Sequence, residues 1–242
     1  MELPVLLLIA FVVLLIGISK SAFAGALGVF AVPLLMLKLP ATQAIAIMLP
    51  LLIIADAMSL RSFWRKWDVT LLKRLIPGAI LGVIFANFII DFIDPSYLRV
   101  VIALLCIVFA LKNIVFKNIE LEFLKSTFGA YLMSASSGVS STLVHAGGPP
   151  LIMYFTAIKL PQAKFVATAA AFFAVMNIGK LIGALSFGLL SIDIALTALA
   201  FAPVAFFGNW VGVYINKRLN KVLFLKIMNY ILLLLGLWLI IN

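Results

Sequence analysis

The sequence predicts an all-α polytopic membrane protein made of two halves, each with five apolar segments, that are inserted in opposite orientations. Of the 242 residues, 66% are hydrophobic and 11% are charged, and the mean hydropathy is +1.28. A water-soluble domain of this size could not bury so much apolar surface. The apolar stretches are also continuous, which favours membrane helices over alternating β-strands. A polar motif that occurs once in each half indicates duplication.

Turn residues and charges divide the chain into ten apolar segments. The first repeat, residues 1–120, contains segments 3–18, 23–37, 42–60, 72–92 and 97–115, and the second, residues 121–242, contains 124–140, 144–158, 162–188, 193–215 and 222–241. The first two segments of each half are shorter than the ~20 residues that cross a bilayer, so we expect tilted spans or re-entrant half-helices. Because Met1-Glu2 lacks the basic region of a signal peptide, the first segment is expected to be retained.

The repeated motif is a small polar stretch, followed further along by a Lys-Leu-Pro sequence. Gly17-Ile18-Ser19-Lys20-Ser21 precedes Leu37-Lys38-Leu39-Pro40, and Gly138-Val139-Ser140-Ser141-Thr142 precedes Ile158-Lys159-Leu160-Pro161. Every equivalent pair is 121 positions apart (138 − 17). In a membrane chain, a duplicated polar interruption of apolar sequence indicates the binding site of a transporter.

Equivalent loops of the two halves differ in charge. The loop after the third segment is basic, with Arg61, Arg65, Lys66, Lys73 and Arg74, whereas its counterpart around Ser191 and Asp193 has no basic residue. The loop after the fourth segment contains Asp91, Asp94 and Arg99, and its counterpart contains Lys217, Arg218, Lys221 and Lys226. Because basic loops stay in the cytoplasm, we expect inverted halves, with both termini outside the cytoplasm. Trp64 and Trp67 fit the aromatic belt at the cytoplasmic interface.

The polar stretches contain the residues that we expect to bind substrate. Glycine lets the backbone turn, hydroxyl groups donate hydrogen bonds, and a helix that begins at such a break directs its first N–H groups at an anion. Proline suits that first turn, because its missing N–H costs nothing there. The expected substrate-binding residues are Ser19, Lys20, Ser21, Gly25 and Gly28 in the first half and Ser140, Ser141, Thr142, His145, Gly147 and Gly148 in the second. We expect the two breaks to face each other near mid-membrane. The alternative is that small residues merely permit close helix packing.

Lys20 and His145 are the two titratable residues of these stretches. A lysine at membrane depth is costly unless it faces a cavity or a partner, so Lys20 could be the fixed positive charge that attracts an anion. It would be an ordinary loop lysine if the first segment crossed fully. His145 is the only histidine, and it is either a substrate ligand or a hydrogen-bonded packing residue. With no cysteine or carboxylate neighbours, it does not form a metal site.

Asp56 is a carboxylate inside the third segment. Its equivalent in the second half is Asn177, and Lys180 lies one turn further along. If the inverted halves face each other, Asp56 could pair with Lys180 as a structural salt bridge, or Asp56 could be a cap near an interface. The functional alternative is that Asp56 carries the coupling proton.

Three pairs of glycines are spaced four residues apart, which favours close helix packing. They are Gly78/Gly82, Gly179/Gly183 and Gly208/Gly212. Pro77 and Gly82 of the fourth segment also match Pro203 and Gly208, at an offset of 126 positions (203 − 77).

The chain resembles the TauE/SafE family of membrane transporters, also called the sulfite exporter or TSUP family. The resemblance rests on the two breaks, above all Gly138-Val-Ser-Ser-Thr-Leu-Val-His-Ala-Gly-Gly-Pro-Pro-Leu-Ile, and on Gly208-Asn-Trp-Val-Gly-Val-Tyr-Ile-Asn-Lys-Arg-Leu and Leu232-Leu-Leu-Leu-Gly-Leu-Trp-Leu-Ile. It implies a bacterial inner-membrane protein that moves sulfite, sulfoacetate or other small organosulfur anions. The first break departs from the family's glycine-richer form at Ala24, Ala26 and Leu27.

We therefore expect a proton-coupled secondary transporter of small sulfur-containing anions such as sulfite, thiosulfate, sulfoacetate or related organosulfonates. The preference for anions follows from the hydroxyl and N–H donors, and the preference for sulfur follows from the resemblance alone. No catalytic residue, cofactor or metal site is predicted, and no Walker-type loop is present. The net charge of +10 does not indicate nucleic-acid binding, because the basic residues lie in loops between apolar segments. The alternatives are a passive anion channel, or an intramembrane enzyme or maturation factor that uses His145 with Ser140 or Ser141.

Overall fold

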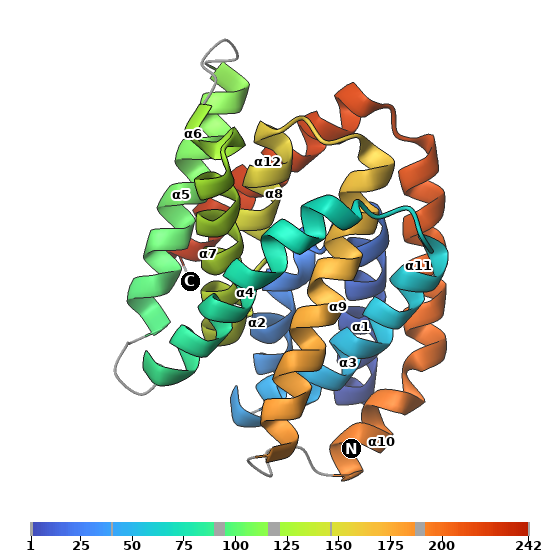
Figure 1. Ribbon diagram of the computed structural model, residues 1–242. Helices are drawn as coiled ribbons and strands as arrows, with labels where there is room; N and C mark the ends of the chain where they lie inside the picture. Colours follow the sequence, from blue (N-terminus) through green and yellow to red (C-terminus); the bar gives the residue numbers. More distant parts are fainter. Residues whose placement is uncertain are drawn as a thin grey trace. The chain divides into compact units, whose positions relative to one another are not determined.

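The computed structural model describes residues 2–39, 41–89, 95–115, 122–145, 147–186 and 192–241, and every regular element within these ranges is helical (Figure 1). The helices are α1 (Leu3–Ala22), the 3-10 helix η1 (Ala26–Phe30), α2 (Ala31–Met36), α3 (Ala41–Ser62), α4 (Val69–Ile89), α5 (Pro95–Val115), α6 (Glu122–Lys125), α7 (Thr127–Val144), α8 (Gly148–Ala157), α9 (Gln162–Ser186), α10 (Ile192–Ala200), α11 (Ala202–Arg218) and α12 (Lys221–Ile241). The loop residues Asp91, Asp94 and Ser191 lie outside the described residues.

The helices follow the ten predicted segments with three differences. The sixth segment begins in the short helix α6, and the ninth, 193–215, is divided between α10 and α11. We expected the first segment of each half to be short, but α1 has 20 residues and α7 has 18. The second segments are short as expected, since η1 and α2 together cover residues 26–36 and α8 has 10 residues. By length and composition, four helices of the described chain could cross a membrane, and a fifth if α10 and α11, bent by 48°, form one span.

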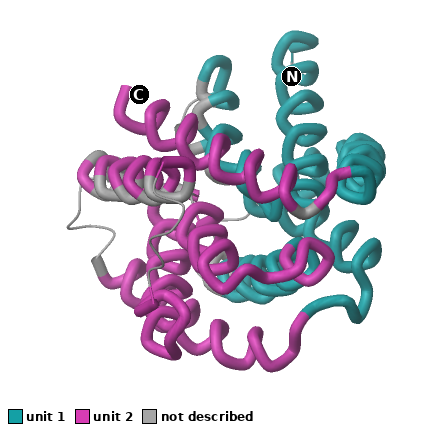
Figure 2. Tube along the Cα trace, turned by 90° about the horizontal axis from the view of Figure 1, so that it is seen from above, with its two compact units in different colours: residues 1–67, 166–218 teal, residues 68–165, 219–242 magenta. Residues whose placement is uncertain are grey.

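The chain forms two compact units (Figure 2). Unit 1 contains residues 1–67 and 166–218, and unit 2 contains residues 68–165 and 219–242. Each unit therefore combines segments from both sequence halves. The division of the sequence into repeats at residue 120 concerns ancestry rather than compactness, and it stays a prediction.

In unit 1, α1 packs along α11 at a contact made of glycines. A side-chain carbon added at Gly17 would lie 2.8 Å from the carbonyl oxygen of Ala205. One added at Gly208 would lie 2.6 Å from the carbonyl oxygen of Leu14, and one at Gly212 would lie 2.8 Å from that of Ile18. Gly208 therefore lies against Leu14, and Gly212, four residues later, lies against Ile18, also four residues later. Residue numbers increase in the same direction along both helices, so α1 and α11 are parallel. Small residues let their backbones approach closely.

Unit 2 contains the corresponding contact between α4 and α7. A carbon added at Gly82 would lie 2.2 Å from the carbonyl oxygen of Ala135, and one at Gly78 would lie 2.9 Å from that of Tyr131. Likewise, one added at Gly138 would lie 2.4 Å from the carbonyl oxygen of Ala79. These helices also run parallel. The close packing predicted for the glycine pairs of α4 and α11 is confirmed, whereas that for Gly179 is wrong, because its side faces open space.

Alanine substitutions at Gly82 and Gly179 should have opposite effects on stability. Alanine favours a helix over glycine by about 1 kcal/mol, and at Gly179 it meets nothing within 4 Å. At Gly82 the added carbon would overlap Ala135, and overpacking costs about 1–3 kcal/mol. Thermal melts of the purified protein should show a higher Tm for Gly179→Ala and a lower Tm for Gly82→Ala. Equal shifts in the two variants would contradict the close approach of α4 and α7.

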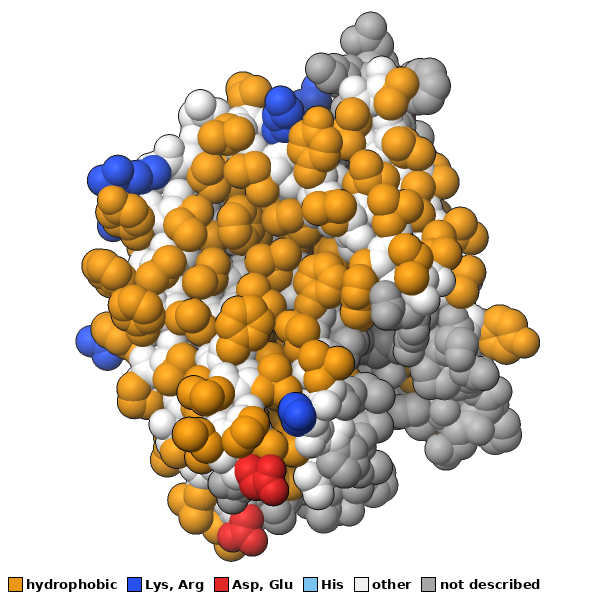
Figure 3. Space-filling view, turned by 180° about the vertical axis from the view of Figure 1, so that it is seen from behind, with side chains coloured by type: hydrophobic (Ala, Val, Ile, Leu, Met, Phe, Trp, Pro, Cys, Tyr) orange, Lys and Arg blue, Asp and Glu red, His pale blue; other side chains and the backbone are white. Residues whose placement is uncertain are grey.

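The surface is that of a multi-pass membrane protein. Figure 3 shows a face covered mainly by hydrophobic side chains, with the acidic groups near its lower edge. Large apolar side chains are exposed along the outside of both units, among them Leu7, Phe88, Phe207 and Leu234. Such an extent of exposed apolar surface is stable in lipid rather than in water.

Asp68, just before α4, forms an ion pair with Lys164 in the first turn of α9. Its carboxylate also caps α4 by accepting the N–H of Leu71 at 3.0 Å. The Leu71 N–H, and after it Lys164, hold the pKa of Asp68 below its usual value of 3.8.

Because the folded state lowers this pKa, the charge of Asp68 stabilises the fold at pH above 3.8, and the contribution disappears as the pH falls through the lowered pKa. We expect Asp68→Asn to lower Tm modestly near neutral pH and the two proteins to converge in acid. Melts over a pH series measure the difference. A gap that stayed constant into strong acid would show that the charge of Asp68 is not involved.

Candidate functional site

The two polar stretches are helical, which corrects the prediction that they interrupt the helices. Gly17 lies within α1 and Gly138 within α7. The hydroxyls of Ser140 and Thr142 donate to the carbonyls of Ser137 and Gly138, at 3.3 and 2.9 Å. Such local bonds let hydroxyl residues remain in a helix, and the two glycines are used for helix packing. The actual breaks follow each stretch, at residues 23–25 and, among the described residues of the second half, at His145 and Gly147.

At the first break the chain turns through two residues in the left-handed region, Ala24 at φ 52° and Gly25 at φ 81°. Glycine adopts this conformation without strain. The hydroxyl of Ser19 accepts the N–H of Leu27 at 2.9 Å, and so satisfies one donor at the start of η1. Gly28 lies inside η1 and has open space beside it.

At the second break His145 ends α7 in the left-handed conformation, at φ 54°, with its N–H bonded to the carbonyl of Ser140. The hydroxyl of Ser137 donates to the carbonyl of Gly147 at 2.6 Å, which ties the break back to α7. Pro149 and Pro150 occupy the first turn of α8, as predicted. They also remove two N–H groups from that helix start, which leaves fewer donors for an anion than we expected.

The closest assembly of charged groups lies in unit 1, where Lys20 of α1 meets Asp56 of α3. The Lys20 Nζ atom is 2.6 Å from Asp56 Oδ1. Asn177 of α9 donates from Nδ2 to Asp56 Oδ2 at 2.6 Å. Lys20 is 6% exposed, Asp56 is 1% and Asn177 is 2%. An ion pair this deep among apolar helices is costly unless it is well bonded, and such groups in membrane proteins mark pathways for ions and substrates.

Two further residues surround the Lys20 ammonium. It lies 4.6 Å from the centre of the Phe173 ring on α9, within the range of a cation–π interaction. Gly25 lies beside both: a carbon added there would be 3.5 Å from the Phe173 ring and 3.7 Å from the Lys20 stem. The glycine therefore leaves room for about one methyl group next to the lysine.

Sequence reasoning grouped Asp56 with Asn177 and Lys180 and identified Lys20 apart from them. The structure brings both Lys20 and Asn177 into direct contact with Asp56. Lys180 lies one turn beyond Asn177 on α9, and its charge acts on Asp56. The expected Asp56–Lys180 salt bridge stays a prediction. Phe173 was missed, because an aromatic residue in an apolar helix carries no distinguishing signal.

A second buried polar network joins α1 and α3 to α11. Asn209 of α11 accepts the hydroxyls of Ser21 and Ser59 at Oδ1 and donates from Nδ2 to Ser62 at 2.8 Å. The hydroxyls of Ser21 and Ser59 are 3.0 Å apart. Ser21, predicted to bind substrate, is therefore part of the α1–α3–α11 contact. Sequence reasoning also missed Asn209, although it follows Gly208 directly in a quoted motif.

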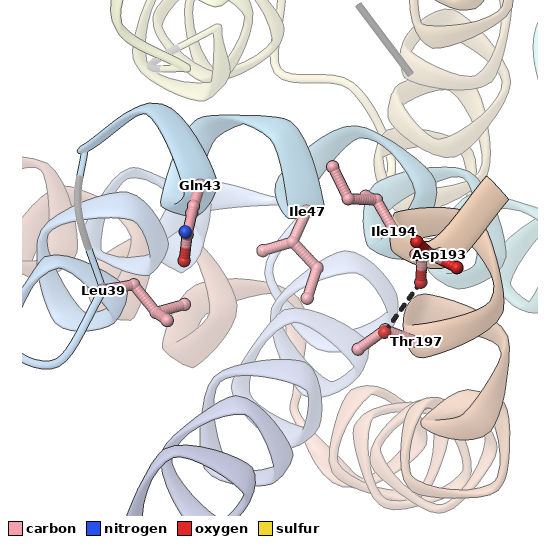
Figure 4. A pocket seen from close by; sticks show the side chains of 6 residues that line it. All are labelled: Leu39, Gln43, Ile47, Asp193, Ile194 and Thr197. Atoms are coloured by element: carbon pink, nitrogen blue, oxygen red, sulfur yellow. Dashed lines mark hydrogen bonds between the residues drawn. The ribbon is translucent and has the colours of Figure 1, made fainter. Parts of the chain in front are cut away.

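A cavity of about 260 Å³ lies between α3 and α10, also in unit 1 (Figure 4). It is lined by Leu39, Gln43, Ile47, Asp193, Ile194 and Thr197. The Thr197 hydroxyl donates to the backbone carbonyl of Asp193 at 2.8 Å, so it is already engaged. Because the charged group of this lining is a carboxylate, the cavity does not suit an anion.

Several apolar helices with a buried ion pair among them define a helical membrane protein, and charged groups at such depth are typical of ion and substrate pathways. The family model described as Sulfite exporter TauE/SafE matches residues 9–239 of the 242, and the chain belongs to this family. It is a family of transporters, so the chain is a multi-pass membrane protein of the sulfite-exporter type. Neither a curated protein nor a solved structure matches the chain.

Proposed function

We propose that the protein is a secondary transporter that moves small sulfur-containing anions, such as sulfite, thiosulfate and sulfoacetate, across the inner membrane in a proton-coupled manner. The observation that carries the proposal is the buried ammonium of Lys20, held between Asp56 and Phe173 beside the first break. An ammonium offers three N–H donors and a compact charge. In a dry site it attracts an anion far more strongly than it would in water.

The hydroxyls have a smaller role in this proposal than the sequence alone suggested. Ser19, Ser21, Ser140 and Thr142 bond to groups of the protein itself. Lys20 is then the main anion-binding group, and Gly25 leaves the approach to it open. The residues of the second break, including Ser141, His145, Gly147 and Gly148, remain proposed substrate contacts.

The proposal includes two inverted repeats. Successive helices alternate in direction, so segments one and four of one half run oppositely. Segment one of each half packs parallel to segment four of the other, as α1 with α11 and α4 with α7. This arrangement supports the proposed inversion. The third segment of each half, α3 and α9, is consistent with this. Asp56 bonds to Asn177, and Asp68, further along the chain, pairs with Lys164, which is earlier in α9. Residue numbers therefore increase in opposite directions, as they do in antiparallel helices.

Single cysteines at exposed positions in a loop or in the first turn of a helix test this topology. We expect cysteines at Trp64 and Val222 to react with impermeant reagents from the cytoplasmic side, and cysteines at Tyr97 and Ile192 to react from the outside. All four positions are exposed. The native Cys106 is buried, so we expect it not to react with these reagents. If the cysteines introduced at Trp64 and Ile192 reacted from the same side of the membrane, the result would contradict the inversion.

A ligand screen tests the substrate class. Ligands that bind the folded state stabilise it by mass action and so raise Tm. A ligand concentration of 100 times Kd adds about 2.7 kcal/mol to the free energy of unfolding. We expect sulfite, thiosulfate or sulfoacetate to stabilise the purified wild type but not Lys20→Met, and acetate and phosphate to have smaller effects. Stabilisation by phosphate or acetate alone would overturn the sulfur assignment.

A further inference from the structure

The carboxylate of Asp56 occupies the position that a substrate anion would need. Its Oδ1 atom lies 2.6 Å from Lys20 Nζ. An anion that approached the ammonium while this pair was intact would meet a lysine whose charge is already balanced and a carboxylate that repels it. At short range in a low-dielectric site, both effects are large. The binding-competent site therefore requires that the charge of Asp56 be removed.

We propose that the substrate anion and the coupling proton use the same pair of side chains: protonation of Asp56 releases Lys20, and the anion takes the place of the carboxylate. The inference rests on the function proposed above. A proton from water binds Asp56 Oδ1, the ion pair breaks, and Lys20 keeps its charge and binds the anion. When the anion leaves, Asp56 loses the proton to water and closes on Lys20 again. One proton thus accompanies each anion.

Asn177 suits both states of Asp56. In the charged state its Nδ2 donates to the carboxylate at 2.6 Å. An amide also has a carbonyl oxygen, so after rotation the same side chain can accept the O–H of the protonated acid. A lysine or arginine at this position would hold Asp56 charged, and an apolar residue would leave it without this bond. Asn177 is thus a positioning residue for the proton carrier.

The other groups that act on Asp56 in the described structure are Lys20 from α1 and Lys180 from α9. Lys180 could itself produce pH-dependent binding, since gain of a proton by a lysine also favours an anion. Separate variants of Asp56 and Lys180 distinguish the two sources.

Thiosulfate is the probe, because its own charge does not change between mildly acidic and mildly alkaline pH. We expect its affinity for the purified wild type to rise about tenfold for each unit of decreasing pH, the slope for one linked proton. Calorimetric titration in two buffers of different ionisation enthalpy should show the uptake of one proton per anion. Asp56→Asn should bind tightly with no slope and no proton uptake. Lys180→Met, and the matched carboxylate variant Asp68→Asn, should keep the wild-type slope.

The inference and the proposed function fail in different ways. Two results would overturn the proposal that anion and proton share this pair of side chains: a wild-type affinity that does not change with pH, or a pH slope that persists in Asp56→Asn. Neither result would contradict the proposed transport of anions. A slope lost only in Lys180→Met would assign the proton to Lys180 instead. Failure of every sulfur anion in the screen to bind wild type or Asp56→Asn would overturn the function itself. If Asp56→Asn does not fold, proton uptake by Lys180→Met decides the question: uptake of one proton per anion supports the shared pair, and its loss overturns it.

Discussion

Replacing Lys20 with methionine is expected to destabilise the protein by about 3–5 kcal/mol, because it leaves the Asp56 carboxylate buried without its cation. Asp56 is 1% exposed in this conformation, so little hydration is available to replace the lost partner. The double variant Lys20→Met/Asp56→Leu should recover much of this loss, because no charge remains to be compensated. Denaturation of the three proteins in one detergent measures the effect.

Lys164→Met is the matched control. It removes a lysine from an ion pair with Asp68 at 3.0 Å, but Lys164 is half exposed, and exposed pairs contribute about 0–1 kcal/mol. A loss in Lys20→Met no larger than that in Lys164→Met would contradict the account of the buried pair. Recovery of stability without recovery of transport in the double variant would separate the structural role of Lys20 from its role in binding.

Replacing Asn209 with alanine is expected to have the second largest effect. One side chain bonds three serine hydroxyls from α1 and α3, and each buried polar group left without a partner costs about 1–3 kcal/mol. Asn220→Ala is the control, since Asn220 only caps α12 by accepting the N–H of Leu223 at 2.8 Å, and such a cap is worth about 1 kcal/mol.

We expect Tm to fall several times further in Asn209→Ala than in Asn220→Ala. Equal losses would indicate that the Asn209 network is hydrated and contributes little. Since Asn209 lies where α11 meets α1 and α3, the result also reports on how firmly the helix carrying Lys20 is fixed.

The segment boundaries were predictable because long apolar stretches and charged loops leave few alternatives. The positions of the breaks were less predictable. Glycine and serine were interpreted as interruptions, but Gly17 and Gly138 pack against neighbouring helices, and Ser140 bonds within its own helix. Glycine and serine occur both at helix breaks and at close helix–helix contacts. Which of the two is present depends on whether a neighbouring helix packs against these residues.

The ion-pair partner of Asp56 could not be derived from the sequence. The repeat offset indicated Asn177 and Lys180, because equivalent positions of inverted halves can meet. Lys20 is in the same half as Asp56. The contact between the two residues depends on how α1 packs against α3, which no pattern of residue types predicts. Asp56 and Asn177 were nevertheless recognisable as polar exceptions in apolar segments, and Lys20 as the charge in the polar stretch of the first half.

Flux through purified protein in liposomes tests the central claim most directly. We predict saturable counterflow of labelled sulfite by the wild type, competition by thiosulfate, and no flux in Lys20→Met that has been shown to be folded and inserted. Saturation and counterflow would distinguish a transporter from a passive channel. Absence of sulfite flux through folded wild-type protein, or unchanged flux in folded Lys20→Met, would contradict a sulfur-anion transporter that binds its substrate at Lys20.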